Sequence, residues 1–306
     1  MPSANGTGTQ TAAPSHTPAL PDVTGTVVDD TSGKPIAGAT VYVSEATIIA
    51  GATPPPASAT PWPAATTAAD GSFDVSNVAP SMWTASFAYV GTGYPVYTTA
   101  QWIDVFPTDG HAAYHAIHTI AATGTTNLGS IQIALPSAAD SAWLNQINAD
   151  RANIGVPPVN SPLIFDSVTL QTARYWAQQM ATGNFFAHTC PPAPTTCVEF
   201  WLYETQHGSI PSSQNIDQQP ANATWQNAEA AFMGETANCP GANWQTCPFS
   251  ESTGHYINIM SATNWAGVAS NSDNYVENFA TPISVIQSAA PQARSRRTAI
   301  TLPFNR

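Results

Sequence analysis

The sequence predicts two domains, an N-terminal all-β antiparallel sandwich followed by a C-terminal α/β domain. The first reason is length, because 306 residues exceed what one ordinary hydrophobic core organises. The second is a change of pattern at Pro136, where short β-branched segments give way to apolar residues at helical spacing. The third is the return of strand-like segments near residue 265. Helices followed by strands favour a layered α/β arrangement.

Short β-branched segments separated by Gly, Asp and Pro define the first domain, residues 21–136. Strands are expected over residues 23–28, 39–43, 81–90 and 129–135, and residues 69–75 are expected to form a turn that leads into a further strand. Their number and punctuation favour an antiparallel sandwich. Residues 50–67 are rich in Pro, Ala and Thr and are expected to form an extended surface loop. Residues 1–20 carry almost no large apolar side chains, so we expect a flexible tail there.

The second domain is assigned to residues 137–285, and residues 286–306 follow as an arginine-rich C-terminal tail. The expected elements are a helix after Asp140, a helix capped by Asp166, a helix over residues 224–235, and strands over residues 265–269 and 274–279. Before the first of these strands, Gly254 and His255 precede the apolar residues 256–260. We interpret that run as a strand that follows a glycine turn.

Charge is scarce and unevenly distributed. Charged residues make up 8% of the chain, the formal net charge is -12, and Lys34 is the only lysine. Nucleic-acid binding needs clustered cations, so a nucleic-acid partner is excluded for the body of the chain. No apolar run reaches the roughly 20 residues of a membrane helix, so the chain is not expected to be transmembrane. The acidic, lysine-poor composition is typical of an extracellular protein. It is also compatible with a protein that functions at low pH.

Four cysteines give the second indication of an extracellular location. The simplest pairing closes two local loops, Cys190–Cys197 and Cys239–Cys247, and implies an oxidising compartment. The alternative is a zinc site that uses all four cysteines, although zinc ligands are usually spaced more tightly. Residues 1–6 lack the features of a secretory signal. We therefore expect a secreted or cell-surface protein whose signal peptide is absent from this chain.

Four stretches of the first domain, residues 25–29, 33–41, 69–73 and 128–131, combine strand and turn motifs. By these stretches the first domain resembles the carboxypeptidase regulatory-like family, a small transthyretin-like β-sandwich. The resemblance implies an accessory module that acts as a spacer or adhesive unit and carries no active site.

Several short motifs follow one another along the second domain, at residues 144–151, 163–177, 186–189, 254–260 and 265–268. By these stretches the second domain resembles the CAP superfamily, also called the SCP, PR-1 or cysteine-rich secretory protein family. The resemblance implies an αβα sandwich with a cleft of two histidines and two glutamates. By motif the histidines are His188 and His255, and one glutamate is Glu235. Gln214 stands where the family has its other glutamate, and an amide can neither act as a base nor neutralise a cation.

The residue types also define the chemistry of the predicted cleft. Neutral imidazole nitrogen suits a divalent metal such as Zn²⁺, and a carboxylate can orient the imidazole, so His188 and His255 are the predicted ligands. We expect a divalent cation, Zn²⁺ or Mg²⁺. Glu251, four residues before His255, is the alternative carboxylate. The same groups could transfer a proton, but they supply no nucleophile.

A second group of histidines, His111, His115 and His118, is interpreted as exposed or packing residues. In a strand His111 and His115 would share one face and His118 would point away.

Three functions follow from these observations. The leading hypothesis is a secreted, non-enzymatic protein whose cleft binds a divalent cation, a small apolar ligand such as a lipid or sterol, or both. The second is a metal-assisted hydrolase that acts on peptide or cell-envelope material. The third is a purely adhesive extracellular protein. The sequence contains no pattern that predicts the identity of the ligand, the oligomeric state or the role of the arginine-rich tail.

Overall fold

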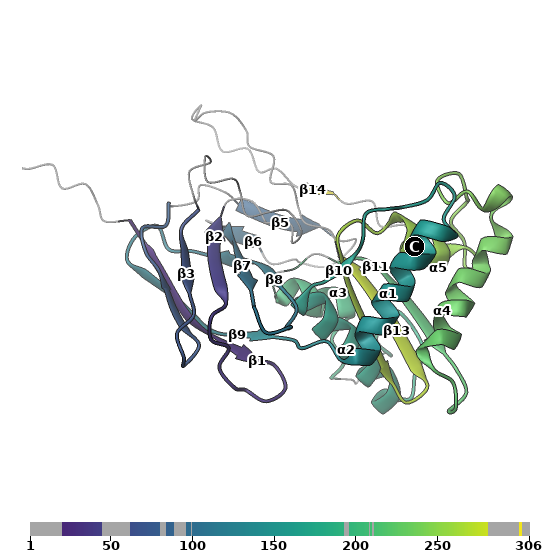
Figure 1. Ribbon diagram of the computed structural model, residues 1–306, viewed down its shortest axis with the longest axis horizontal. Helices are drawn as coiled ribbons and strands as arrows, with labels where there is room; N and C mark the ends of the chain where they lie inside the picture. Colours follow the sequence, from purple (N-terminus) through teal and green to yellow (C-terminus); the bar gives the residue numbers. More distant parts are fainter. Residues whose placement is uncertain are drawn as a thin grey trace, which may run out of the picture.

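The computed structural model describes most of the chain between Leu20 and Ala280 (Figure 1). The described ranges are residues 20–44, 62–79, 84–88, 96–98, 100–192, 196–207, 209, 211–280 and 300–301. The predicted N-terminal tail, most of the loop at residues 50–67 and nearly all of the C-terminal tail lie outside these ranges. Within them the chain is a mixed α/β protein with several antiparallel strand pairs and five α-helices.

Strands dominate the first part of the described chain. They are β1 (Asp22–Asp29), β2 (Thr40–Ser44), β3 (Ala64–Thr66), β4 (Ser72–Val75), β5 (Thr84–Ala88), β6 (Val96–Thr98), β7 (Ala100–Phe106), β8 (Tyr114–Thr119) and β9 (Thr125–Ile133). One sheet has the order β4-β1-β9, and a second has the order β3-β2-β7-β8. Buried Val23 and Ile131 of the first sheet share a core with Val41 and Ile103 of the second. Two sheets that bury one face each against a common core form a β-sandwich. A further small sheet joins β5 and β6 to β14 (Ile300–Thr301).

One strand pairing departs from the expected antiparallel arrangement. β1 and β9 run parallel, with Asp22 opposite Thr125 and Asp29 opposite Ile133. The apolar alternation that marks each strand reports which side chains are buried, and it is identical for both strand directions. The alternation therefore predicts the two strands and leaves their relative direction open.

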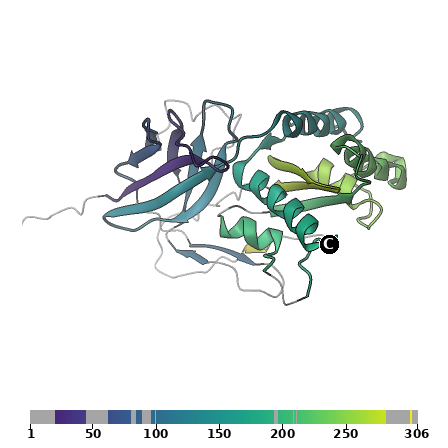
Figure 2. The ribbon, with the colours of Figure 1, turned by 90° about the horizontal axis from the view of Figure 1, so that it is seen from below.

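The second part of the chain surrounds one four-stranded sheet with helices. Its helices are α1 (Ala138–Asn153), α2 (Ser167–Gly183), α3 (Phe200–Gln206), α4 (Trp225–Gly234) and α5 (Gly254–Ser261). Its strands are β10 (Ile164–Phe165), β11 (Pro211–Gln218), β12 (Trp265–Asn271) and β13 (Asn274–Ala280), in the order β10-β12-β13-β11. Residues of α1, α4 and α5 share one core with the sheet, and residues of α2 and α3 share another. Figure 2 shows the sheet between these two groups of helices.

Local sequence explains why these helices form where they do. Ser137 caps α1 and exchanges hydrogen bonds with Asp140, and Asp166 caps α2 by accepting from the amide of Thr169. α2 also crosses β12 closely at Gly267, where a Cβ atom would overlap the carbonyl oxygen of Thr169. The predictions of the Asp166 cap, of the helix after Thr224 and of strands β12 and β13 are confirmed.

The run after His255 is a helix, so its interpretation as a strand is wrong. Tyr256, Ile259 and Met260 are buried, and their spacing of three and four residues places them on one face of α5. The run is short and apolar on most positions, and such runs do not distinguish a strand from a buried helix. Gly254 is the first residue of the helix, and no glycine turn precedes it.

Both local disulfides are present. Cys190 is bonded to Cys197 and Cys239 to Cys247, and no free cysteine is found in the described ranges. The alternative of a four-cysteine zinc site is therefore wrong. Disulfides persist in oxidising compartments, which weakly favours an extracellular location. Among the described helices, none has the length and apolar character needed to cross a bilayer.

The seam between the sandwich and the helical part is polar as well as aromatic. His115 of β8 is fully buried, its Nδ1 lies 2.8 Å from Asp104 Oδ1, and its ring stacks on Trp265 of β12 at 4.6 Å. His111 precedes β8 and lies between Asp29 and Asp109 at 2.9 and 2.7 Å. His115 is thus a packing residue, as the sequence predicts.

Candidate functional site

The first predicted histidine, His188, lies in the loop that follows α2. The helix ends at Asn184, which adopts the left-handed conformation, and the loop is then held by a hydrogen bond from Trp176 Nε1 to the Ala187 carbonyl at 3.1 Å. His188 itself is exposed, and its Nδ1 lies 2.9 Å from Gln214 Oε1 on β11. The loop and the sheet therefore hold the ring from two sides.

The orientation of the Gln214 amide fixes which nitrogen of His188 carries the proton. Gln214 Nε2 donates to Asn278 Oδ1 at 2.9 Å, and the two residues are paired across β11 and β13. The amide oxygen therefore faces His188 and can only accept. Nδ1 of His188 must donate, so in the neutral ring the lone pair is on Nε2.

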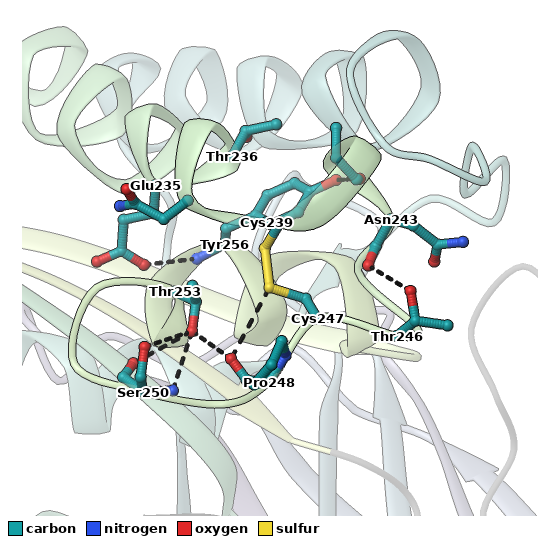
Figure 3. Close-up of a disulfide and its surroundings, with 12 residues drawn as sticks. Glu235, Thr236, Cys239, Asn243, Thr246, Cys247, Pro248, Ser250, Thr253 and Tyr256 are labelled. Atoms are coloured by element: carbon teal, nitrogen blue, oxygen red, sulfur yellow. Dashed lines mark hydrogen bonds between the residues drawn. A yellow bond between two sulfur atoms is a disulfide. The ribbon is translucent and has the colours of Figure 1, made fainter.

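The second predicted histidine, His255, is held by Glu235. Its Nδ1 lies 2.7 Å from Glu235 Oε1, and Glu235 Oε2 accepts from the main-chain N–H groups of His255 at 2.8 Å and Tyr256 at 3.3 Å. These N–H groups belong to the first turn of α5, where a carboxylate satisfies free donors and the helix dipole. Figure 3 shows Glu235 directed at this turn, beside the Cys239–Cys247 disulfide.

The helix that carries His255 is also fixed at its other end. Arg151 of α1 is fully buried, and its guanidinium donates to the carbonyl oxygens of Ile259 and Met260. A cation at the C-terminus of α5 complements the carboxylate at its N-terminus. Thr253, just before the helix, donates to the Pro248 carbonyl at 2.7 Å and closes the preceding turn (Figure 3).

Amide side chains join the two histidine-bearing regions. Asn258 of α5 donates to Asn215 Oδ1 at 2.9 Å and to the Gln214 carbonyl at 3.3 Å. Asn215 in turn donates to the His255 carbonyl at 3.2 Å. The backbone beside Gln214 and the backbone of His255 are thus held in one hydrogen-bonded unit.

The electrostatic environment of His188 includes His255. Burial of its ring lowers the pKa of His188, the hydrogen bond that the ring donates to Gln214 raises it, and the charge of His255 lowers the pKa further. A neutral His188 at pH 7 presents an Nε2 lone pair, which is the form that binds metals.

The structure brings together four of the five predicted cleft residues in two pairs, His188 with Gln214 and His255 with Glu235. The alternative carboxylate, Glu251, is exposed, and the carboxylate bonded to His255 is Glu235. Phe232 of α4 packs against the His255 ring with a centroid separation of 4.8 Å. His255 therefore has an apolar and a charged neighbour.

The donor set limits what the site can hold. Within the described ranges, no three His, Cys, Asp or Glu side chains come close enough together to hold a metal ion. A closed metal cage made only of side chains does not fit here. Both imidazoles have Nδ1 occupied, and no described residue bonds to either Nε2.

Several residues that build the site are not found by sequence reasoning. Asn278 and Glu277 lie on β13, all of whose residues are buried, and Asn215 lies opposite Glu277 on β11. Asn215 Nδ2 donates to Glu277 Oε2 at 2.8 Å. The signal for them is a Glu-Asn pair in the middle of an otherwise apolar strand, since buried polar side chains need partners.

The comparisons with known proteins do not assign this chain to a family. No protein-family profile matches the chain, and no curated protein matches it. Similar solved structures include a variant of the major pilin subunit of Bacillus cereus (11% identity, 38% of this chain and 30% of that chain, TM-score 0.21). They also include catechol 1,2 dioxygenase of Acinetobacter radioresistens (13% identity, 39% and 53%, TM-score 0.26) and a minor pilin of Streptococcus agalactiae (15% identity, 39% and 45%, TM-score 0.23).

The chain spans about a third to about half of the length of these three structures. TM-scores this low give no support to any statement on fold or function.

Proposed function

We propose that this chain is a secreted, non-enzymatic CAP-family protein that binds a divalent cation through Nε2 of His188 and Nε2 of His255. In this proposal residues 21–136 are an accessory sandwich of the carboxypeptidase regulatory-like type, and residues 137–285 form the two-histidine domain. The remaining positions on the cation are left to water or to a donor from a bound molecule.

The anchoring of both imidazoles through Nδ1 supports the proposal most strongly. Gln214 and Glu235 each occupy that nitrogen, so the second nitrogen of each ring is the one available to a ligand. A partner on the far nitrogen fixes the tautomer and orientation of a metal-binding histidine. Both rings therefore have the arrangement that metal-binding imidazoles use.

Ligand chemistry favours Zn²⁺ over Mg²⁺ at such a site. Imidazole nitrogen suits zinc, whereas magnesium requires oxygen ligands. Both oxygens of Glu235 are engaged by N–H groups of α5, so its role is to hold His255. That engagement also argues against the hydrolase alternative, which needs a base free to activate water. An apolar ligand such as a lipid or sterol rests on the family resemblance alone.

Calorimetric titration of the full chain with Zn²⁺ tests the proposal. The unaltered protein should bind the ion, and the double variant His188→Ala/His255→Ala should lose binding. His207→Ala is the matched control, because His207 is exposed and bonds through Nδ1 to the Tyr203 carbonyl at 2.7 Å. Equal binding by the double variant, or no binding by the unaltered protein, rejects the site.

Gln214→Glu adds a sharper test. It restores a carboxylate behind His188, and changes in such supporting residues typically alter metal affinity by about 10-fold or more. We expect zinc affinity to rise by roughly tenfold. An unchanged affinity would contradict an assignment of His188 as a ligand.

A further inference from the structure

Two glutamates meet inside the core below the histidines. Glu229 of α4 and Glu277 of β13 are 2% and 0% exposed. Trp143 Nε1 lies 3.0 Å from Glu229 Oε2 and 3.0 Å from Glu277 Oε1, so both carboxyl groups converge on a single N–H group. One indole hydrogen cannot neutralise two carboxylates.

Among the described residues, no lysine or arginine side chain pairs with these two carboxyl groups. Asp150 of α1 faces Glu229 and adds a third acid, while β11 contributes the neutral amide of Asn215 to Glu277. The neighbouring guanidinium, Arg151, donates to main-chain carbonyls instead. From α5, His255 exerts a charge effect on Glu277 that is the weakest of the influences on that group. Two buried carboxylates without a cation cannot both be ionised.

We propose that Glu229 and Glu277 share a proton that locks α4 onto the sheet, so that the fold is most stable in acid and weakens as the pH rises. The proton supplies the hydrogen bond that two ionised carboxylates cannot make. Ionisation would leave two negative charges facing each other in the core and would separate the helix from the strand.

The direction of the pH dependence follows from linkage. Burial raises the pKa of Glu229, and the charge of Glu277 raises it further; burial likewise raises the pKa of Glu277. A carboxyl group whose pKa is higher in the folded state binds more protons there, so stability falls as pH rises. The stabilisation is complete below the unfolded pKa, near 4.5, and is lost progressively as the pH rises toward the folded pKa.

A second buried pair acts in the same direction. Glu204 of α3 and Asp166, the cap of α2, are both fully buried and share Thr169 Oγ1 at 3.3 and 2.9 Å. Burial raises the pKa of both, and the charge of His115 opposes the effect on Asp166. Asp104 already pairs with His115 through Nδ1. The two pairs lie on opposite faces of the sheet. Low pH therefore stabilises the packing of both layers of helices on the sheet.

The shared proton of Glu229 and Glu277 also affects the position of His255. This effect does not depend on what the histidines bind. Glu235 directly follows α4 and holds both His255 and the first turn of α5. Asn215, which donates to Glu277, also donates to the His255 carbonyl. Displacement of α4 would therefore disturb the anchor of His255 before the rest of the sheet unfolds.

Urea unfolding of the full chain between pH 5 and pH 8 tests the proposal. The unaltered protein should lose stability with rising pH, by up to about tenfold in the unfolding equilibrium constant per pH unit for each proton involved, or about 1.4 kcal/mol. Glu229→Gln and Glu277→Gln should each show a clearly smaller pH dependence. The control Glu251→Gln, at an exposed site, should follow the unaltered protein.

Two outcomes overturn the proposal. One is stability of the unaltered protein that stays level or rises from pH 5 to pH 8. The other is a pH dependence in both glutamine variants that matches the control. Infrared spectroscopy of the unaltered protein in D₂O provides a measurement that needs no variant to fold. The carbonyl stretch of a protonated carboxylic acid should be visible at pH 7, and its absence also overturns the proposal.

Discussion

His188 and His255 are held through the same ring nitrogen by two different groups. His188 bonds to the neutral amide of Gln214, which Asn278 orients, whereas His255 bonds to the carboxylate of Glu235. Glu235 also satisfies the first N–H groups of α5, whereas the Gln214 side chain bonds to His188 and to Asn278 of β13. The anchor of His255 is thus part of the fold, while the anchor of His188 mainly sets the proton position on one ring.

The largest effect is expected from removal of the carboxylate anchor. Glu235→Ala deletes an acceptor for three N–H groups, and hydrogen bonds to charged groups are worth about 1.5–3 kcal/mol each. Because the side chains of Glu235 and His255 are both partly exposed and water can replace part of these bonds, we expect a total loss equal to about one such bond, about 2.5 kcal/mol in the free energy of unfolding measured in urea. Glu251→Ala, at an exposed position, should change stability by less than about 0.5 kcal/mol. Similar losses in both variants would mean that Glu235 is not an anchor.

A smaller effect is expected when the two anchors are made alike. Gln214→Glu places a carboxylate beside His188, which favours the charged ring, so the pKa of His188 should rise. The raised pKa makes the variant relatively more stable in acid, and that gain disappears as the pH rises through the folded pKa. At pH 8 the buried carboxylate should cost about 1.5 kcal/mol.

NMR titration of His188 and urea unfolding at two pH values measure both effects of Gln214→Glu. Gln178→Glu, on the exposed face of α2, is the control and should leave the His188 titration unchanged. If Gln214→Glu leaves the His188 titration unaltered, the group bonded to Nδ1 does not control the protonation of this ring. The contrast drawn between the two anchors would then be wrong.

The smallest effect is expected from the residue behind Gln214. Asn278→Leu removes the acceptor for the Gln214 amide, but Asn278 Nδ2 has no partner among the described residues, so little stability is lost. We expect a change below about 1 kcal/mol. The proton of His188 should redistribute toward Nε2, which ¹⁵N NMR detects. Asn278→Asp keeps the acceptor and should preserve the Nδ1 proton.

Sequence patterns predict the parts of this protein that local chemistry determines. The Asp166 cap, the helix after Thr224 and both disulfides follow from short-range preferences. Strand direction in the β1–β9 pair and the helical state of the run after His255 depend on tertiary contacts. The family resemblance selects His188, Gln214, Glu235 and His255 as cleft residues, the structure supplies their pairing, and their function stays a prediction.

The buried pair of Glu229 and Glu277 is the part of the structure that is least predictable from the sequence. Glu229 and Glu277 are 48 positions apart, and nothing in either segment indicates that the two carboxyl groups face each other across one indole. Burial of an acid is normally unfavourable, so propensity places both residues at the surface. Only the docking of α4 on β13 reveals the pair.

The parallel pairing of β1 with β9 determines how this molecule would respond to mechanical load. The chain enters the sandwich at Asp22 and leaves it beyond Ile133, at opposite ends of the same pair of strands. A force that pulls these two ends apart would act on all the hydrogen bonds between β1 and β9 together, in shear. It would not open them one at a time. We therefore expect the sandwich to resist extension between Asp22 and Ile133 more strongly than a strand pair loaded one hydrogen bond at a time.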